Sequence, residues 1–156
     1  MRGSYDEIRS RGGEVVAVGT GSVRHAAAFV ADEDMPFPVL VDDDEVVIAS
    51  LCHDIGKAVS VPNHPRIAAE ILKPYVRDDV YWMILVHQDF QGRHYYHHFG
   101  GDPNARDQYQ GHAAYELAER FADEWDQAAF DPAYDTLPLE HFEPRLRELF
   151  ANPKSL

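Results

Sequence analysis

The chain has 156 residues, 45% of them hydrophobic and 26% charged, which is typical of one compact globular domain. Its 14 Lys and Arg against 27 Asp and Glu give a net charge of −13, which excludes a general binder of nucleic acid or anionic membranes because both require a basic surface. No segment approaches the roughly 18 apolar residues of a membrane span, and the polar residues 1–13 do not resemble a signal peptide. We therefore expect a cytoplasmic protein, in which the single cysteine, Cys52, forms no internal disulfide.

The N-terminal residues predict a β-α-β fragment. Residues 14–19 (EVVAVG) are a short apolar run rich in β-branched side chains, which favours a buried strand. Residues 22–34 carry apolar side chains at helical spacing after a capping serine. Two prolines within residues 36–38 end that helix, and residues 39–41 predict a second short strand.

The rest of the chain is predicted to be helical. Asp44 and Asn63 are suited to cap the helices that follow them. Residues 88–110 are polar and rich in histidine and aromatic side chains, and they predict a long loop. Loops of that length inside a compact domain are usually functional or mobile. The predicted helices cover residues 45–52, 64–73, 78–87, 111–129 and 139–150.

The chemically most informative pair is His53-Asp54, at the end of an apolar helix. Neighbouring residues on a helix point about 100° apart, so both can reach one metal only where the helix unwinds, and Gly56 favours that unwinding. A buried carboxylate without a partner is costly, and metal coordination would satisfy it. The chain also has nine histidines beside its 27 acids, and mixed imidazole and carboxylate donors are typical of first-row metal sites.

The segment Ala49–Lys57 (ASLCHDIGK) resembles the signature of the HD-domain superfamily, which is named for its metal-binding His-Asp pair. The similarity continues with His64 at the start of one helix, His87 at the end of the next, and Asp126 late in a long helix. This order resembles the subgroup described as predicted HD phosphohydrolases, which includes mixed-valent di-iron oxygenases that cleave organophosphonates. The resemblance covers about residues 43–150 and implies a mainly α fold, an HD-domain helical bundle with a short N-terminal β-α-β remnant.

The resemblance also implies a set of metal ligands. In it, Asp54 would bridge two metals with its two carboxylate oxygens. His53 and Asp126 would bind the first metal, and His64 and His87 the second. Donors of this kind suit a divalent transition metal, and we expect two Fe ions, with Mn, Ni or Zn as alternatives. Close to Asp126, the acids Asp123 and Glu124 are competing candidates on the same helix.

One further ligand is uncertain in the sequence, because the family's first histidine lies on a helix before the His-Asp pair. His25 is the only upstream histidine, and it is either that ligand or a polar position on the helix of the N-terminal fragment. Residues 12–44 resemble the middle β-α-β of peroxiredoxin-like proteins of the alkyl-hydroperoxide-reductase type. The predicted domains are therefore an incomplete peroxiredoxin-like fragment, 1–43, and an HD domain, 44–150, which lacks its first helix unless the fragment supplies it.

A substrate site is expected beside the metals. The predicted catalytic residues are Asp54, Lys57 and Arg93, and Arg93 could hold phosphate or carboxylate oxygens in a bidentate manner. Side chains of the predicted loop could complete a wall around an anionic substrate, or they could simply be solvated: His94, Tyr95, Tyr96, His97 and His98.

The expected function is that of a metal-dependent enzyme acting on a small phosphorylated or phosphonate-type substrate, with di-iron oxygenase chemistry preferred. The first alternative is a metal-dependent phosphohydrolase, and the second is an inactive metal-binding module with an incomplete first site. A thiol peroxidase is disfavoured, because Cys52 belongs to the His-Asp helix. The partner expected besides the substrate is a second copy of the chain, since the strand edges of an incomplete β-α-β favour pairing or disorder.

Overall fold

The computed structural model of the chain describes residues 8, 10–11, 17–20, 39–42 and 44–154. The chain forms two compact units, residues 1–47 and 48–156. The boundary between the units falls within helix α3 (Asp44–Cys52). Among the helices of the described residues, none combines the length and the apolar character that crossing a membrane would need.

The N-terminal unit contains two short parallel strands, β1 (Ala17–Thr20) and β2 (Val39–Asp42). Ala17 lies opposite Val39 and Thr20 opposite Asp42. Both predicted strands are therefore confirmed over the residues that the structure describes; residues 14–16 of the first apolar run lie outside them. The helix predicted for residues 22–34, which includes His25, lies outside the described residues.

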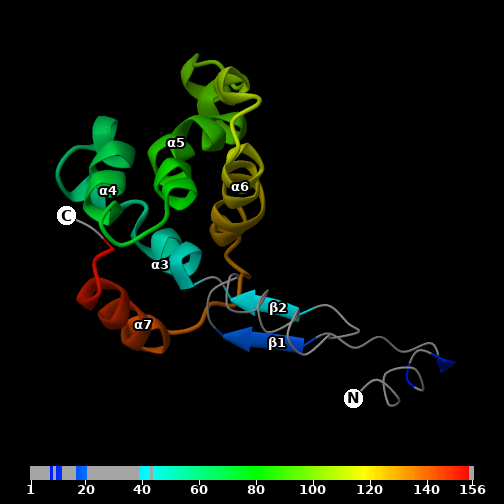
Figure 1. Cartoon of the computed structure of the whole chain (residues 1–156). Coiled ribbons are helices and arrows are strands. Elements are labelled where there is room, and N and C mark those ends of the chain that lie inside the picture. Colours follow the sequence, from blue (N-terminus) through cyan, green and yellow to red (C-terminus); the bar gives the residue numbers. More distant parts are fainter. Residues whose placement is uncertain (1–7, 9, 12–16, 21–38, 43, 155–156) are drawn as a thin grey trace. The chain divides into compact units, whose positions relative to one another are not determined.

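The second unit is helical, as predicted, and α5 (Asp78–Tyr95) lies between α4 (His64–Leu72) and α6 (Tyr115–Arg120) (Figure 1). Two acids in the first turn of α5 and two basic side chains in its last turn match the helix dipole. Short helical turns connect these elements: η1 (Ile55–Ala58), η2 (Val61–Asn63), η3 (Tyr96–Phe99), η4 (Ala105–Tyr109), the π-helix η5 (Phe121–Asp126) and η6 (Ala128–Phe130).

The core of this unit forms where α5 meets its two neighbours. Met83, Ile84 and Phe90 of α5 are fully buried. Leu72 of α4 and Phe121 of η5 are buried with them. The apolar positions recur at helical spacing on α5, so that burial of one helix face against two neighbours accounts for the packing.

The loop predicted for residues 88–110 is wrong. Helix α5 continues to Tyr95, and η3 and η4 occupy much of the remainder. Polar residues persist inside this structure because they find partners: Asp89 accepts hydrogen bonds from the hydroxyls of Tyr96 and Tyr109. Gly92 makes room for the Tyr96 ring, because a Cβ at this position of the helix would lie 2.5 Å from that ring. The sequence pattern did not indicate a helix here, because the polar side chains are stabilised by partners that lie far along the chain.

The helix predicted for residues 111–129 is confirmed only in part. Residues 111–114 stay outside it, and Gly111 adopts φ 88°, a left-handed conformation that glycine accepts easily. The regular helix then changes into the π-helical turn η5 before the short turn η6.

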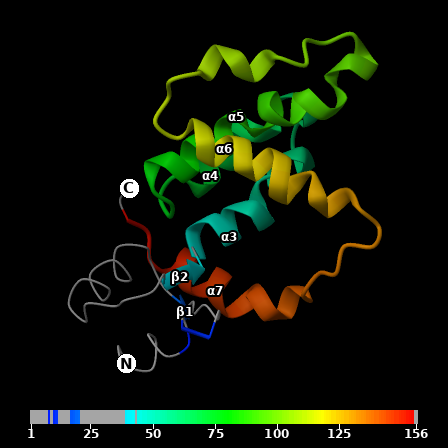
Figure 2. The ribbon, with the colours of Figure 1, turned by 90° about the vertical axis from the view of Figure 1, so that its right-hand side faces the viewer.

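The final helix α7 (Leu139–Ala151) matches its prediction closely. Residues 131–138, which lead to it, contain no helix or strand and are drawn in orange in Figure 2. The Phe150 ring lies 4.8 Å from the Tyr75 ring, measured between centroids, and the Lys154 amide donates to the Pro74 carbonyl. These two contacts attach the C-terminal segment to the connection between α4 and α5.

Candidate metal centre

The His53-Asp54 pair lies in the turn between the end of α3 and the start of η1. This confirms that the helix unwinds at the pair, but the unwinding precedes Gly56. The function of Gly56 is space: a Cβ at this residue would lie 2.3 Å from the His64 carbonyl oxygen. The glycine therefore lets the first turn of α4 approach the His-Asp turn.

Three imidazoles direct their Nε2 atoms toward the carboxylate of Asp54. The Nε2 atoms of His64 and His87 lie 3.1 and 3.6 Å from Asp54 Oδ1. The Nε2 atom of His53 lies 3.4 Å from the other oxygen, Oδ2. The carboxylate thus has imidazoles on both of its oxygens, which is the arrangement that a bridge between two ions requires.

The opposite nitrogen of each imidazole fixes the tautomer. Each Nδ1 lies within hydrogen-bond distance of a backbone carbonyl three residues earlier in the chain. Because a carbonyl only accepts, Nδ1 carries the proton and Nε2 of the neutral ring presents a lone pair. The three pairs are His53 with Ser50 at 2.6 Å, His64 with Val61 at 2.6 Å, and His87 with Ile84 at 2.7 Å.

When all three rings are in this neutral form, their Nε2 lone pairs face one another and Asp54 without a hydrogen between them. The Nε2 atoms of His64 and His87 are 3.1 Å apart, and Asp54 Oδ1 is buried with no hydrogen-bond partner among the described residues. Converging acceptors without a donor are unfavourable in a buried site. A transition-metal cation would satisfy all of them, and the donor set fits such an ion.

The electrostatics of the site agree with this interpretation. Burial lowers the pKa of His64 below its ordinary value, so the ring is neutral at pH 7. Burial alone would raise the pKa of Asp54, but interactions with His87 and Lys57 outweigh it and hold that pKa well below its usual range. A neutral imidazole and an ionised carboxylate are the forms that bind metals.

Asp126 joins the site from the π-helix η5. Its Oδ1 atom lies 3.7 Å from His53 Nε2. The Gln91 amide donates a hydrogen bond of 2.6 Å to the other oxygen, Oδ2. The structure therefore brings together all five of the described residues that the resemblance implied as ligands: His53, Asp54, His64, His87 and Asp126. Their action as ligands stays a prediction.

The remaining predicted site residues differ in position. The Lys57 ammonium pairs with Asp54 Oδ2, and its side chain is about half exposed. Arg93 is exposed on α5, and none of the contacts found among the described residues joins it to the cluster. His25 lies outside the described residues.

Gln91 is a site residue that the sequence analysis missed. It lies one helical turn after His87, and Tyr95 lies one turn further, so the three side chains share one face of α5. His87 contacts Asp54 directly. Burial raises the pKa of Tyr95, and the charges of Asp126 and Asp54 raise it further. The spacing of four from His87 could have indicated Gln91 if the helix had been predicted to continue.

The neighbouring acid Asp123, a competitor for the role of Asp126, has other partners. The guanidinium of Arg106, which is buried, donates to both Asp123 oxygens at 3.1 and 3.0 Å. His94 Nε2 lies 2.8 Å from Asp123 Oδ1. His94 therefore supports η5 from α5, whereas His97 and His98 are exposed on η3.

The fold and this cluster together define a helical domain with a partly buried set of imidazole and carboxylate groups that could hold metal ions. The model of the HD domain family matches residues 21–131, and the chain belongs to this family, a superfamily of the metal-dependent phosphohydrolase type. The match also includes residues 21–43, which the sequence analysis placed in a peroxiredoxin-like fragment; that assignment and its boundary stay predictions. Neither the curated proteins nor the solved structures contain a match to this chain.

Proposed function

We propose that the chain is a metal-dependent hydrolase of a small phosphomonoester and that it works with two divalent transition-metal ions. The observation that carries this proposal is the convergence of three imidazole Nε2 atoms on both oxygens of Asp54, one of which is buried without a hydrogen-bond partner among the described residues. Membership of the HD domain family supports it.

The proposed ligand sets follow the two sides of the Asp54 carboxylate. His53 and Asp126 would hold one ion, His64 and His87 the other, and Asp54 both. Two such ions supply Lewis acidity, which polarises a phosphoryl oxygen and lowers the pKa of a water molecule.

The protein's own groups would bind and orient the substrate. The Lys57 ammonium lies at the edge of the cluster, where it pairs with Asp54. When the Asp54 carboxylate binds metal ions, the ammonium would be free to bind an anionic phosphate oxygen of the substrate. The Tyr95 hydroxyl keeps its proton, because its pKa is raised, and it can therefore donate a hydrogen bond to a substrate oxygen. The half-buried carboxylate of Asp126 stays oriented through Gln91.

Di-iron oxygenase chemistry on a phosphonate is the second candidate. His53, Asp54 and His87 place one ligand atom each within 4.8 Å of one another, and two imidazoles with one carboxylate are the donor set of non-haem iron oxygenases. The same set also occurs in zinc hydrolases. Hydrolysis ranks first because it needs only water, whereas oxygenation also needs O₂ and a redox-active metal.

Metal content and reaction separate the two candidates. The chain is purified anaerobically with iron and manganese supplied, its metals are counted by mass spectrometry, and phosphate release and O₂ consumption are assayed with phosphomonoesters and phosphonates. Phosphate release from a phosphomonoester without O₂ consumption supports hydrolysis, whereas two Fe ions with substrate-dependent O₂ consumption would replace it with the oxygenase.

A pair of variants makes this experiment specific. Asp54→Asn keeps the shape of the side chain and removes the charge that both ions need, so we expect it to lose metal and activity together. Asp107→Asn makes the same change at an exposed position of η4 and should leave both unchanged. A folded wild-type chain that retains no metal would contradict the proposed function.

A further inference from the structure

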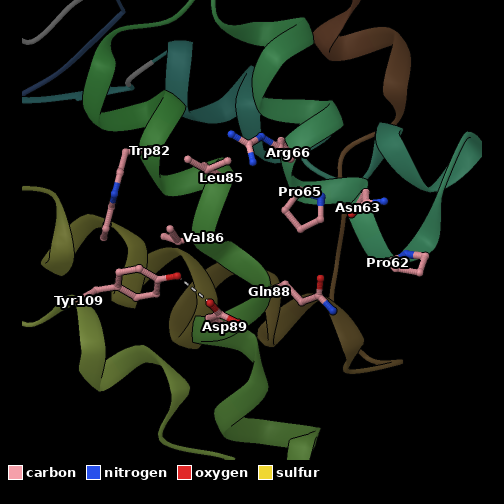
Figure 3. Close-up of a pocket in the computed structure, with 10 residues that line it drawn as sticks. All are labelled: Pro62, Asn63, Pro65, Arg66, Trp82, Leu85, Val86, Gln88, Asp89 and Tyr109. Atoms are coloured by element: carbon pink, nitrogen blue, oxygen red, sulfur yellow. Dashed lines mark hydrogen bonds between the residues drawn. The ribbon is translucent and has the colours of Figure 1, made fainter. Parts of the chain in front are cut away.

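A second concave site lies outside the metal cluster. It is a groove of about 450 Å³ between the start of α4 and one face of α5, with Tyr109 of η4 at its side (Figure 3). None of the five ligand candidates lines it. Its volume falls within the range of small-molecule sites, roughly 300–1,000 Å³.

The groove has one unpaired cation. Arg66 is exposed and forms no ion pair or hydrogen bond with any residue that the structure describes. The chain has a net charge of −13, and Arg77, Arg106, Arg120 and Arg147 each pair with an acid; Arg66 shares its lack of an acidic partner among the described residues with Arg93, which does not line the groove. A free guanidinium presents a planar pair of donors that matches a carboxylate.

The groove also has a rigid aromatic wall. The indole of Trp82 stacks on His112 with a centroid distance of 3.8 Å and an interplanar angle of 9°. The ring of Tyr109 lies edge-on to Trp82 at 5.6 Å, and its hydroxyl donates to Asp89 Oδ2 at 2.7 Å. Because these rings are already held, a planar ligand would lose little affinity to the ordering of side chains.

Charge and polarity limit the ligand further. Asp89 lies at a distance from Arg66, with Leu85 and Val86 between them (Figure 3). A carboxylate inside the groove disfavours a dianion, whereas a single negative charge at Arg66 is matched. The Gln88 amide forms no hydrogen bond with another described residue, so it remains available to a polar substituent.

We propose that this groove binds a small planar monoanion, an aromatic carboxylate, with its carboxylate on Arg66 and its ring against Trp82 and Tyr109. The site is independent of the metal chemistry. Residues that line the groove are nevertheless neighbours in sequence of the proposed ligands. Asn63 and Pro65 flank His64, and Val86 and Gln88 flank His87.

The two tryptophans of the chain allow a direct test. In ¹⁵N-labelled protein, each indole N–H gives one signal; Trp82 reports on the groove, and Trp125, in η5, reports on the surroundings of the cluster. We expect benzoate to shift the Trp82 signal in a saturable way while the Trp125 signal stays in place. Benzamide, which lacks the charge, and cyclohexanecarboxylate, which lacks the flat ring, should bind more weakly.

Variants separate this groove from the metal cluster. Arg66→Gln should weaken benzoate binding about tenfold, as expected for the loss of one charge-assisted pair, and Arg66→Lys should weaken it less. Arg147→Gln, an exposed position on α7, is the matched control and should bind benzoate normally. Chelator-treated Asp54→Asn protein should bind it normally too.

Three results would overturn the proposal. They are no benzoate-dependent shift of Trp82, equal binding by Arg66→Gln, and loss of binding in Asp54→Asn, which would move the ligand to the metal cluster.

Discussion

Gly56 illustrates how one missing side chain determines the distance between two parts of the cluster. A Cβ at this position would lie 2.3 Å from the His64 carbonyl oxygen and 2.7 Å from its Cα. Backbone atoms cannot rotate away as a flexible side chain can. Relief therefore requires α4 to move, together with the imidazole that its first residue supplies.

We therefore expect Gly56→Ala to lower the free energy of unfolding by about 1–3 kcal/mol, the usual cost of overpacking, and to weaken metal binding. Denaturant titration and metal titration measure the two effects. Gly101→Ala is the matched control, because its nearest contact would be the Tyr96 Cβ at 3.3 Å, a side-chain atom. Unchanged stability in Gly56→Ala would contradict the close-approach explanation.

Gln91 acts one step away from the proposed metals. Gln91→Leu keeps a similar volume but removes the donor to Asp126 Oδ2, so we expect metal affinity to fall by about 10-fold or more, as for other residues that orient ligands. Competition with a chelator measures the affinity. Gln88→Leu, on the same helix but outside the cluster, should retain it, and equal affinities in both variants would show that Gln91 does not support Asp126.

The lowered pKa of His64 predicts a pH dependence for the metal-free protein. The ring is neutral in both states above about pH 6.5, the ordinary value. As the pH falls below this value, the unfolded chain binds a proton that the folded chain resists, so stability decreases until the folded-state pKa is reached. Chelator-treated wild type should therefore lose stability from about pH 6.5 downward. His64→Gln should show a smaller loss over the same pH interval, and identical slopes would contradict this assignment.

At the scale of elements, the π-helix η5 carries both a proposed ligand and the residue that fixes the helix. Asp126 meets the cluster, and Asp123 is held by the buried Arg106 and by His94. Single π-helical turns are rare and often occur at functional sites. The Arg106 contacts therefore stabilise the turn that orients Asp126.

We expect Arg106→Met to lower stability by about 2 kcal/mol, because it removes charge-assisted hydrogen bonds from a partly buried acid, and to weaken metal binding as well. Arg120→Met provides the comparison: its exposed pair with Glu124, at 3.3 Å, should contribute less than about 1 kcal/mol. Thermal and chelator titrations of the two variants measure both quantities. Full metal affinity in a folded Arg106→Met protein would separate η5 from the cluster.

The elements also show where sequence patterns are informative. The strands, α4 and α7 follow local signals, namely β-branched runs and helical periodicity, and each was predicted within a few residues. The second half of α5 was predicted as a loop because its stability comes from distant partners such as Tyr109 for Asp89. The change from α6 to a π-helix has no local signal either.

The same distinction applies to the site. The resemblance pointed to five residues that the structure brings together, because the His-Asp pair and the later histidines follow a recognisable order. It could not indicate Gln91 or Arg106, whose importance depends on contacts across the fold. Only the structure explains why a glycine is needed at position 56, because the atom that a Cβ would meet belongs to the backbone of the next helix.

For the whole molecule, metal binding and folding are expected to be linked. The cluster draws on the turn after α3, on α4, on α5 and on η5, so unfolding destroys it and bound metal must stabilise the folded state. At a free metal concentration of 100 times the dissociation constant, the gain is about 2.7 kcal/mol.

Manganese, zinc or iron should therefore raise the unfolding temperature, and a chelator should reverse the rise. Calcium, which prefers oxygen ligands, should have little effect. Differential scanning calorimetry with Asp54→Asn as the control measures this difference. An equal rise in Asp54→Asn would place the stabilising metal elsewhere on this acidic chain.

The hydrogen bonds that orient the three imidazoles have a consequence for sequence variation. Each Nδ1 proton goes to a main-chain carbonyl, that of Ser50, Val61 or Ile84. Every amino acid, proline included, carries this carbonyl, so no substitution at those positions deletes the acceptor itself. Substitutions at Ser50, Val61 and Ile84 therefore leave the acceptors that fix the histidine tautomers in place. Related sequences can vary at these three positions while the imidazole rings keep their orientation.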